Sequence, residues 1–318
     1  AMAGTYEVGE DAPFIKFGDA VDKINKFGDK ENEIILMQNI TLEGEHTLKR
    51  NTTIKGKEGE DHTISIKGEK TGITVTGEKT VLNLGANGYD GTLTIDGNIR
   101  DGSASENTRV AFITVSGGAT ANMYGNVTLQ NRKSTDNACV VIMGPKLVFS
   151  SKSVFNMHGG VIEGCSRAVM AKSGATFNMF GGEIRNCGGG RGSGNGGGVR
   201  VYEATFVMSD GTISGCSADT GGGLCAEKSS TVTISGGTIS GCTASAGGGL
   251  YADNSTINIT GGTISGCTAE KNGGGLYADN SAINISDGTI SGCTADTGGG
   301  LYADSSTVTI KGGTISGC

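Results

Sequence analysis

The sequence contains no tryptophan, only 2 prolines, and no apolar run long enough to span a bilayer. It also lacks a cluster of lysine and arginine, and its formal net charge is -7. The absence of a long apolar run argues against membrane insertion. The absence of a basic cluster argues against nucleic acid or an anionic membrane as a partner. Glycine is abundant, with 58 of 318 residues. The glycines have no three-residue period, which excludes collagen, and they separate short alternating runs, so they mark turns between strands.

Near-identical segments of about 26 residues fill the C-terminal part of the chain, each carrying GGTISGC-like and GGGLYAD-like motifs. Self-similarity at this period predicts a solenoid, in which each unit buries its apolar face against its neighbours. In one repeat Val232, Ile234, Ile239, Leu250 and Ala252 alternate with other residues, so we expect them to point inward. The pattern predicts an all-β fold: a right-handed, single-stranded parallel β-helix with three strands per coil.

Diverged copies and looser strand signals extend the repeats upstream, so that roughly eleven coils fit the chain. Before them, the sequence predicts a short amphipathic α-helix that caps the open core, with these residues on one face: Phe14, Phe17, Val21 and Ile24. We expect residues 1–32 to hold a cloning remnant, Ala1-Met2-Ala3, and this cap, and residues 33–318 to form the β-helix. The chain stops inside a repeat at Cys318, which predicts a truncated helix and end-to-end association through the uncapped last coil.

The turn before each Thr-Ile-Ser segment has a restricted composition. It reads Gly236-Gly237 in one coil and Asp210-Gly211 in another. Only glycine and aspartate occur at the first position, which predicts a positive φ there.

Seven of the 9 cysteines recur in register and predict a ladder along the axis: Cys165, Cys187, Cys216, Cys242, Cys267, Cys293 and Cys318. Stacked Cα atoms about 4.8 Å apart lie within disulfide range, but parallel side chains suit that bond poorly. We therefore expect buried thiols that pack as small hydrophobes, with Asn131 at the same rung of an earlier coil. Cys139 and Cys225 lie off the ladder, and a metal is disfavoured because no histidine shares the column and C-x-x-C spacing is missing.

One outward column combines a cation, a thiol and three aromatic rings: Arg200, Cys225, Tyr251, Tyr277 and Tyr302. Stacked tyrosines form an amphipathic strip that suits sugar rings or a protein partner. Aromatic stacking also stabilises a sheet without any ligand. The strip is the candidate ligand-binding site, and both interpretations stay open.

Carboxylates form the neighbouring column, with Glu227 followed by the candidate metal ligands Asp253, Asp279 and Asp304. Stacked carboxylates repel, so they stay solvated or recruit a cation such as calcium, which needs six to eight oxygens. The nonapeptide pattern of calcium-binding β-rolls is absent, so we favour solvated side chains and no cofactor.

Two further patterns suggest other functions. Regular Thr-x-Ser pairs, such as Thr238 with Ser240, form an outward hydroxyl array similar to that of ice-binding solenoids, although exposed strands favour these residues in any case. In the least repetitive coils, Glu163, Glu183 and Arg185 lie close by register and are the candidate catalytic residues. Their alternative is a surface salt bridge, which contributes at most about 1 kcal/mol.

From about Asn122 onward, with its GGTISG and GGG-[LV]-Y motifs, the chain resembles bacterial cell-surface β-helix repeat proteins of the pectin-lyase-like superfamily, particularly adhesin-like ones. The resemblance implies a secreted or surface-attached protein that extends a binding region from the cell, with a host glycan or host protein as its partner. The superfamily also includes polysaccharide lyases and glycoside hydrolases. We expect a surface adhesin or binding scaffold, with such an enzyme as first alternative and an ice-binding solenoid as second.

Overall fold

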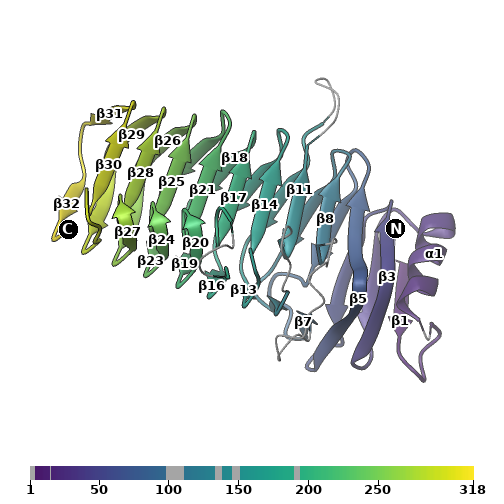
Figure 1. Ribbon diagram of the computed structural model, residues 1–318. Coiled ribbons are helices and arrows are strands. Elements are labelled where there is room, and N and C mark those ends of the chain that lie inside the picture. Colours follow the sequence, from purple (N-terminus) through teal and green to yellow (C-terminus); the bar gives the residue numbers. More distant parts are fainter. Residues whose placement is uncertain (1–3, 15, 98–110, 133–137, 145–150, 190–193) are drawn as a thin grey trace.

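The computed structural model is an elongated right-handed parallel β-helix of about eleven coils (Figure 1). The structure describes residues 4–14, 16–97, 111–132, 138–144, 151–189 and 194–318. The predicted fold class is therefore confirmed. The predicted cloning remnant, residues 1–3, lies outside the described residues.

Each coil contributes one strand to each of three parallel faces. Face 1 stacks β1 (Gly4–Val8), β2 (Asn32–Leu36), β4 (Thr52–Gly56), β6 (Val81–Leu84), β9 (Thr120–Met123), β12 (Val154–Met157), β15 (Thr176–Met179), β18 (Thr205–Met208), β22 (Thr231–Ile234), the first parts of β26 (Thr256–Ser265) and β29 (Ala282–Ser291), and β31 (Thr307–Ile310). Face 2 stacks the first parts of β3 (Ile40–Leu48) and β5 (Asp61–Thr76), β7 (Thr92–Asp96), β10 (Val127–Gln130), β13 (Val161–Glu163), β16 (Glu183–Arg185), β19 (Thr212–Ser214), β23 (Thr238–Ser240), the second parts of β26 and β29, and β32 (Thr314–Ser316).

Face 3 carries the candidate ligand-binding column. It stacks the second parts of β3 and β5, then β8 (Ile113–Ser116), β11 (Val140–Met143), β14 (Val169–Lys172), β17 (Val199–Tyr202), β21 (Leu224–Glu227), β25 (Leu250–Asp253), β28 (Leu276–Asp279) and β30 (Leu301–Asp304). A short fourth ladder, which the alternation pattern did not predict, joins β20 (Ser217–Thr220), β24 (Thr243–Ala246) and β27 (Thr268–Asn272) between faces 2 and 3.

Helix α1 (Phe17–Phe27) lies at the N-terminal end of the solenoid, as predicted for a cap (Figure 1). It buries Phe17, Val21 and Ile24, whereas Phe14 precedes the helix and forms a bridge with Val8. Strand β1 precedes the helix and pairs with β2, a strand that the sequence analysis did not predict. Within the described part of the chain, no helix combines the length and apolarity needed to cross a membrane.

The core consists of identical or similar side chains stacked coil upon coil. Val232, Ile239, Leu250 and Ala252 are fully buried, as the alternation predicted. In the middle coils Phe155, Phe177 and Phe206 stack inside face 1, with ring centroids 5.3 and 5.0 Å apart. Each coil therefore adds a similar increment of buried apolar surface, which stabilises by about 25 cal/mol per Å².

The predicted positive φ at the first turn position is wrong. The second residue, always glycine, has it, with φ of 93° at Gly211 and 79° at Gly237. At the first position Asp210 instead accepts a hydrogen bond from the Gly211 N–H through its own carboxylate, at 2.7 Å. Aspartate at this position thus forms a hydrogen bond within the turn, and the positive φ belongs to the glycine that follows it.

Candidate binding face

The predicted tyrosine column exists on face 3. Parallel pairing places Arg200, Cys225, Tyr251, Tyr277 and Tyr302 on consecutive rungs. The rings of Tyr251 and Tyr277 have centroids 5.0 Å apart and an interplanar angle of 7°, and those of Tyr277 and Tyr302 are 5.1 Å and 19° apart. We call these three tyrosines the tyrosine strip.

The stacking geometry limits what the strip can bind. The rings lie face to face along the helix axis and are half-buried, so neighbours cover most ring faces. Solvent meets ring edges and hydroxyl groups. A sugar ring that stacks on an aromatic side chain needs a free ring face. The strip therefore suits a ligand that forms hydrogen bonds with a row of hydroxyls better than the sugar-stacking platform suggested by the sequence.

Cys225 differs from the tyrosines that follow it in this column. Its side chain is fully buried, not outward and exposed. Thr220 Oγ1 lies 3.8 Å from its sulfur, and Asn195 joins Thr220 to Glu227 through two side-chain hydrogen bonds. Burial raises the pKa of the Cys225 thiol, which keeps it neutral. Cys225 is therefore part of the base of the strip and not a contact residue.

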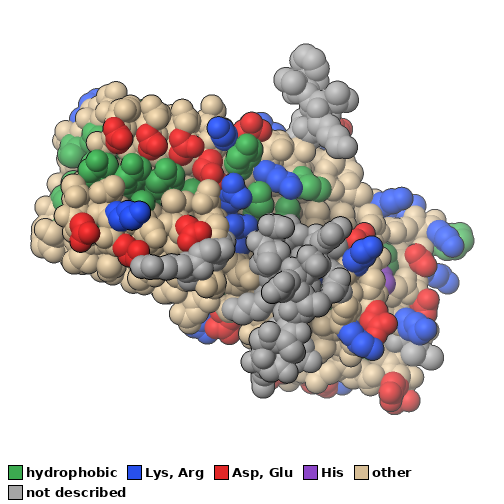
Figure 2. Space-filling model, in the orientation of Figure 1, with side chains coloured by type: hydrophobic (Ala, Val, Ile, Leu, Met, Phe, Trp, Pro, Cys, Tyr) green, Lys and Arg blue, Asp and Glu red, His purple; other side chains and the backbone are tan. Residues whose placement is uncertain are grey.

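A carboxylate column flanks the strip, as predicted, with Glu227, Asp253, Asp279 and Asp304 in register. The space-filling view of this face shows a row of acidic side chains beside the row that includes the tyrosines, with further acidic side chains on the other side (Figure 2). The pKa of Tyr251 is raised by burial first, and then by the negative charges of Asp279 and Asp253. The strip thus lies in a negative field.

Glu227 is the only carboxylate of this column with an ion-pair partner among the described residues. Arg200 Nε lies 2.7 Å from Glu227 Oε2, and the two side chains are 23% and 12% exposed. The Arg200 guanidinium also lies over the ring of Tyr202, 5.6 Å from its centroid. Arg200 is therefore held by the carboxylate column at the beginning of the strip.

No group of three or more histidine, cysteine, aspartate or glutamate side chains in the described ranges has an arrangement that could hold a metal ion. Asp253 and Asp279 lie on separate rungs, and each bonds the side-chain amide of the next residue, Asn254 or Asn280. Six to eight converging oxygens, as calcium requires, are not assembled here. The calcium hypothesis remains a prediction without a described site.

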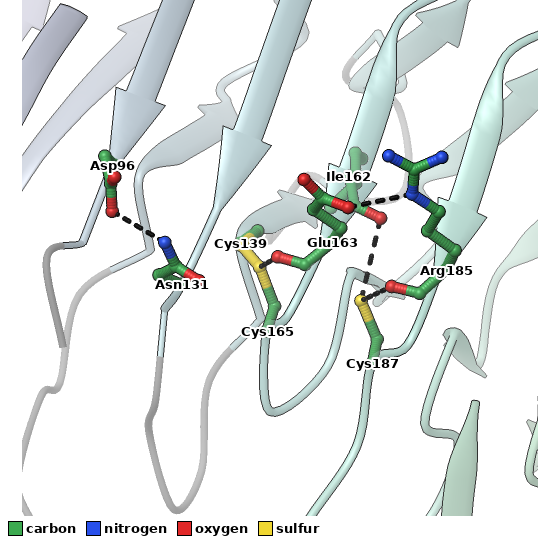
Figure 3. The surroundings of a disulfide bond; sticks show 8 residues. All are labelled: Asp96, Asn131, Cys139, Ile162, Glu163, Cys165, Arg185 and Cys187. Carbon is green, nitrogen blue, oxygen red and sulfur yellow. Dashed lines mark hydrogen bonds and ion pairs between the residues drawn. A yellow bond between two sulfur atoms is a disulfide. The ribbon is translucent and has the colours of Figure 1, made fainter. Parts of the chain in front are cut away.

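The candidate catalytic residues form an ion-pair cluster on face 2, and Figure 3 shows the pair of Glu163 and Arg185. Arg185 Nε lies 2.8 Å from Glu163 Oε2, and Arg185 Nη1 lies 2.9 Å from Glu183 Oε2. The pKa of Arg185 is raised, mainly by its hydrogen bond to Glu163. Because one arginine satisfies both carboxylates, the cluster is that expected of the salt-bridge alternative. A catalytic role for these residues remains a prediction.

The cysteine ladder is present from Cys187 to Cys318, but the expectation of a free thiol at Cys165 is wrong. Cys165 forms a disulfide with Cys139, with Cα atoms 6.3 Å apart (Figure 3). The reason is position: Cys139 directly precedes β11 and Cys165 follows β13 of the same coil, so the two residues approach from opposite ends of one coil. The sequence analysis considered only bonds between stacked rungs, where side chains point the same way.

Asn131 does not occupy the cysteine rung. Because Gln130 pairs with Glu163, Asn131 corresponds to Gly164, and both have positive φ, at 62° and 63°. Arg132 takes the cysteine position instead. It is 2% exposed, and burial lowers its pKa to about 10.

Two side-chain ladders escaped the sequence analysis. Tyr124, His158 and Phe180 stack at one corner, with centroids 5.2 and 5.3 Å apart. The recurring NM-[YHF]-G segment was the signal for this stack. In the same segments, side-chain amides form a chain of hydrogen bonds along face 1 through Asn83, Asn122, Asn156 and Asn178.

The Thr-x-Ser pairs are aligned over the last five coils, with Thr238 on Thr263 and Ser240 on Ser265, for example. The predicted outward array therefore exists. An ice-binding role for it remains a prediction.

Comparison with known proteins agrees with this architecture. Residues 151–315, just over half of the chain, match the family described as right handed beta helix region. The chain therefore belongs to the right-handed β-helix family. A search of characterised proteins found no match to the sequence.

Proposed function

We propose that this protein is an extracellular binding scaffold of the adhesin type, which presents face 3 to a host protein or host glycan. The tyrosine strip is the observation that carries the proposal. The core needs only the inward residues of each LYAD strand, such as Leu250 and Ala252. Tyr251 and Tyr277 alternate with them and point outward, so packing of the interior does not require them.

The disulfide between Cys139 and Cys165 supports the extracellular part of the proposal, because disulfides persist in oxidising compartments and are rare in reducing ones. The remaining ladder does not conflict with it. Cys187, Cys216 and Cys242 are fully buried or nearly so, and a buried thiol is out of reach of a soluble oxidant.

The test is binding of the parent and a strip variant to arrays of host glycans and extracellular host proteins. Replacing Tyr251, Tyr277 and Tyr302 by alanine should weaken binding about tenfold or more, since buried aromatic side chains dominate interface energies. The matched control replaces Thr238, Thr263 and Thr289 by alanine, one residue per coil on face 2. If the tyrosine variant binds as the parent does and its circular dichroism spectrum is intact, the strip is not the binding site and the proposal is wrong.

A polysaccharide lyase or glycoside hydrolase is the alternative, because the β-helix superfamily includes both enzymes and binding proteins. Its candidate residues are Glu163, Glu183 and Arg185. Incubation with uronate and neutral polysaccharides, followed by assay for reducing ends and unsaturated products, tests it directly. Product release that disappears in Glu163→Gln would favour the enzyme over the scaffold.

A further inference from the structure

The carboxylate column of face 3 already binds one cation, and this chain supplies it. Arg200 stands in the column of the strip, one coil before Cys225, and reaches diagonally to Glu227 of the next coil, 2.7 Å away. Its guanidinium rests over the Tyr202 ring. On face 3, one arginine side chain therefore lies between a carboxylate and a tyrosine ring.

The next three carboxylates continue the column without an arginine partner, and the residue one rung before each of them is an acid, where Tyr202 lies one rung before Glu227. The positions diagonal to Asp253, Asp279 and Asp304, equivalent to that of Arg200, are Cys225, Tyr251 and Tyr277. Among the residues that the structure describes, none forms an ion pair with these three aspartates. The outward edge of the tyrosine strip adds hydroxyl oxygens, which accept hydrogen bonds from a cationic donor.

Most of the charge around the strip is negative, and two lysines, Lys228 and Lys271, lie beside Glu227 and Glu270. Asp219 lies in the fourth ladder, on the opposite side of the strip from the carboxylate column, and Glu270 and Asp296 recur at the same turn in two later coils. Figure 2 shows acidic side chains on both sides of the strip. Such a field attracts cations and repels anionic partners, including acidic glycans.

We propose that the ligand of face 3 is a cationic protein segment rich in arginine, whose guanidinium groups pair with Asp253, Asp279 and Asp304 as Arg200 pairs with Glu227. The inference rests on the proposed function and names the chemical class of its partner. Arginine fits better than lysine because its planar fork forms two parallel hydrogen bonds with one carboxylate. Neutral glycans fit less well because the strip presents ring edges.

The test uses the whole chain and a short synthetic peptide of alternating arginine and glycine, with a second peptide in which citrulline replaces every arginine. Citrulline keeps the shape of arginine and removes its charge. Binding is measured by isothermal titration calorimetry at low and at high ionic strength. We expect the arginine peptide to bind at least about tenfold more tightly than the citrulline peptide, with a difference that shrinks as salt screens the charges.

The variant that locates the site replaces Asp253, Asp279 and Asp304 by asparagine, which should weaken binding of the arginine peptide about tenfold. The control is Asp22→Asn with Glu45→Gln and Glu58→Gln, three exposed acids elsewhere, which change the net charge equally and should leave binding within about twofold. Equal losses in the two variants would mean unspecific attraction to an acidic protein and would overturn the inference.

The two proposals fail in different ways. If the tyrosine variant loses its array ligand while the asparagine variant keeps it, face 3 is a binding site but its partner is not cationic. If neither variant changes binding to any array ligand, the proposed function itself is wrong.

Discussion

Cys139 begins the coil that Cys165 ends, and their disulfide joins the two ends of that coil across 6.3 Å between Cα atoms. In the next coil, Ala168 and Cys187 occupy the same two positions, because β11 pairs with β14 and β13 pairs with β16. Ala168 is fully buried and already carries a Cβ at this point. The second coil therefore already has one of the two cysteines that an equivalent disulfide needs, Cys187.

Ala168→Cys should form a second disulfide, with Cys187. The loop that it closes has about 20 residues, for which the chain-entropy model gives about 3 kcal/mol of stabilisation. The number of free cysteines, seven in the parent, should fall by one and not rise by one. Mass spectrometry of peptides from the unreduced protein, together with thermal unfolding with and without reductant, checks both statements.

Gly223→Ala is the contrasting control for that substitution. Gly223 holds the same position two coils further along, but a Cβ there would lie 2.7 Å from the Gly249 carbonyl oxygen and 3.3 Å from the Cys242 sulfur. We expect a lower melting temperature for this variant, because backbone must move to admit the methyl group. An unchanged melting temperature would show that the backbone of this coil moves to admit a Cβ at little cost. The backbone geometry around Cys139 and Ala168 would then not be needed to admit a side chain at this position.

The thiol ladder should be chemically silent in the folded protein. Six of the seven free cysteines are buried and Cys318 is exposed. The pKa of Cys242 is raised to about 12, by hydrogen bonding with the Cys216 sulfur and by burial, so its reactive thiolate is absent near pH 8. N-ethylmaleimide should label Cys318 rapidly and the others only with denaturant, as followed by intact mass. Rapid labelling of Cys242 in the native protein would contradict a closed core.

The raised pKa values of the ladder thiols make the free energy of unfolding depend on pH in the alkaline range. Hydrogen bonding with the Cys242 sulfur, together with burial, raises the pKa of Cys267 to about 12, whereas an unfolded cysteine titrates near about 8.5. Above about pH 8.5 the unfolded chain loses thiol protons that the folded chain retains, so the free energy of unfolding falls as pH rises towards 12. Urea unfolding at pH 8 and 9.5 should show this fall. Cys242→Ser with Cys267→Ser should reduce the slope, because serine does not titrate.

The repeat predicted the fold, and the errors at Asn131 and Cys139 lie in the irregular coils. Where the sequence repeats, alternation alone identified the buried Val232 and Leu250 and the stacked Tyr251 and Tyr277, because equivalent letters lie on consecutive rungs. Position Asn131 was misplaced by one residue, since nothing in the letters distinguishes a turn residue with positive φ from the buried residue after it. The Cys139 disulfide depends on a contact across one coil, which a comparison between coils does not reveal.

Glu163→Gln should weaken the fold only slightly. Arg185 and Glu163 are 42% and 30% exposed, so solvent screens their attraction, and such pairs contribute about 0–1 kcal/mol. Arg185 also keeps its contact with Glu183 in the variant. A double-mutant cycle with Arg185→Met, measured by urea unfolding, gives the coupling between the two residues. A coupling free energy well above about 1 kcal/mol would show that the pair contributes more to stability than an ordinary surface ion pair.

The amide ladder of face 1 ends at Asn178 because the next residue in the column is Val207, and one substitution there could extend it. Each asparagine donates its side-chain N–H to the amide oxygen of the preceding coil, and Asn178 donates to Asn156 at 2.9 Å. The residue above Asn178 is Val207, whose side chain has no N–H that could donate to the Asn178 amide oxygen. Val207→Asn should extend the ladder by one rung and add about 1 kcal/mol, the usual net contribution of a hydrogen bond.

The matched control is Thr205→Asn, which places the same residue on the same strand, pointing outward above Thr176 and outside the ladder. Thermal and urea unfolding of both variants separate the new hydrogen bond from the general effect of asparagine, which is a poor strand former. We expect Val207→Asn to be more stable than Thr205→Asn. Equal stabilities would mean that the ladder is a consequence of stacking and contributes nothing of its own.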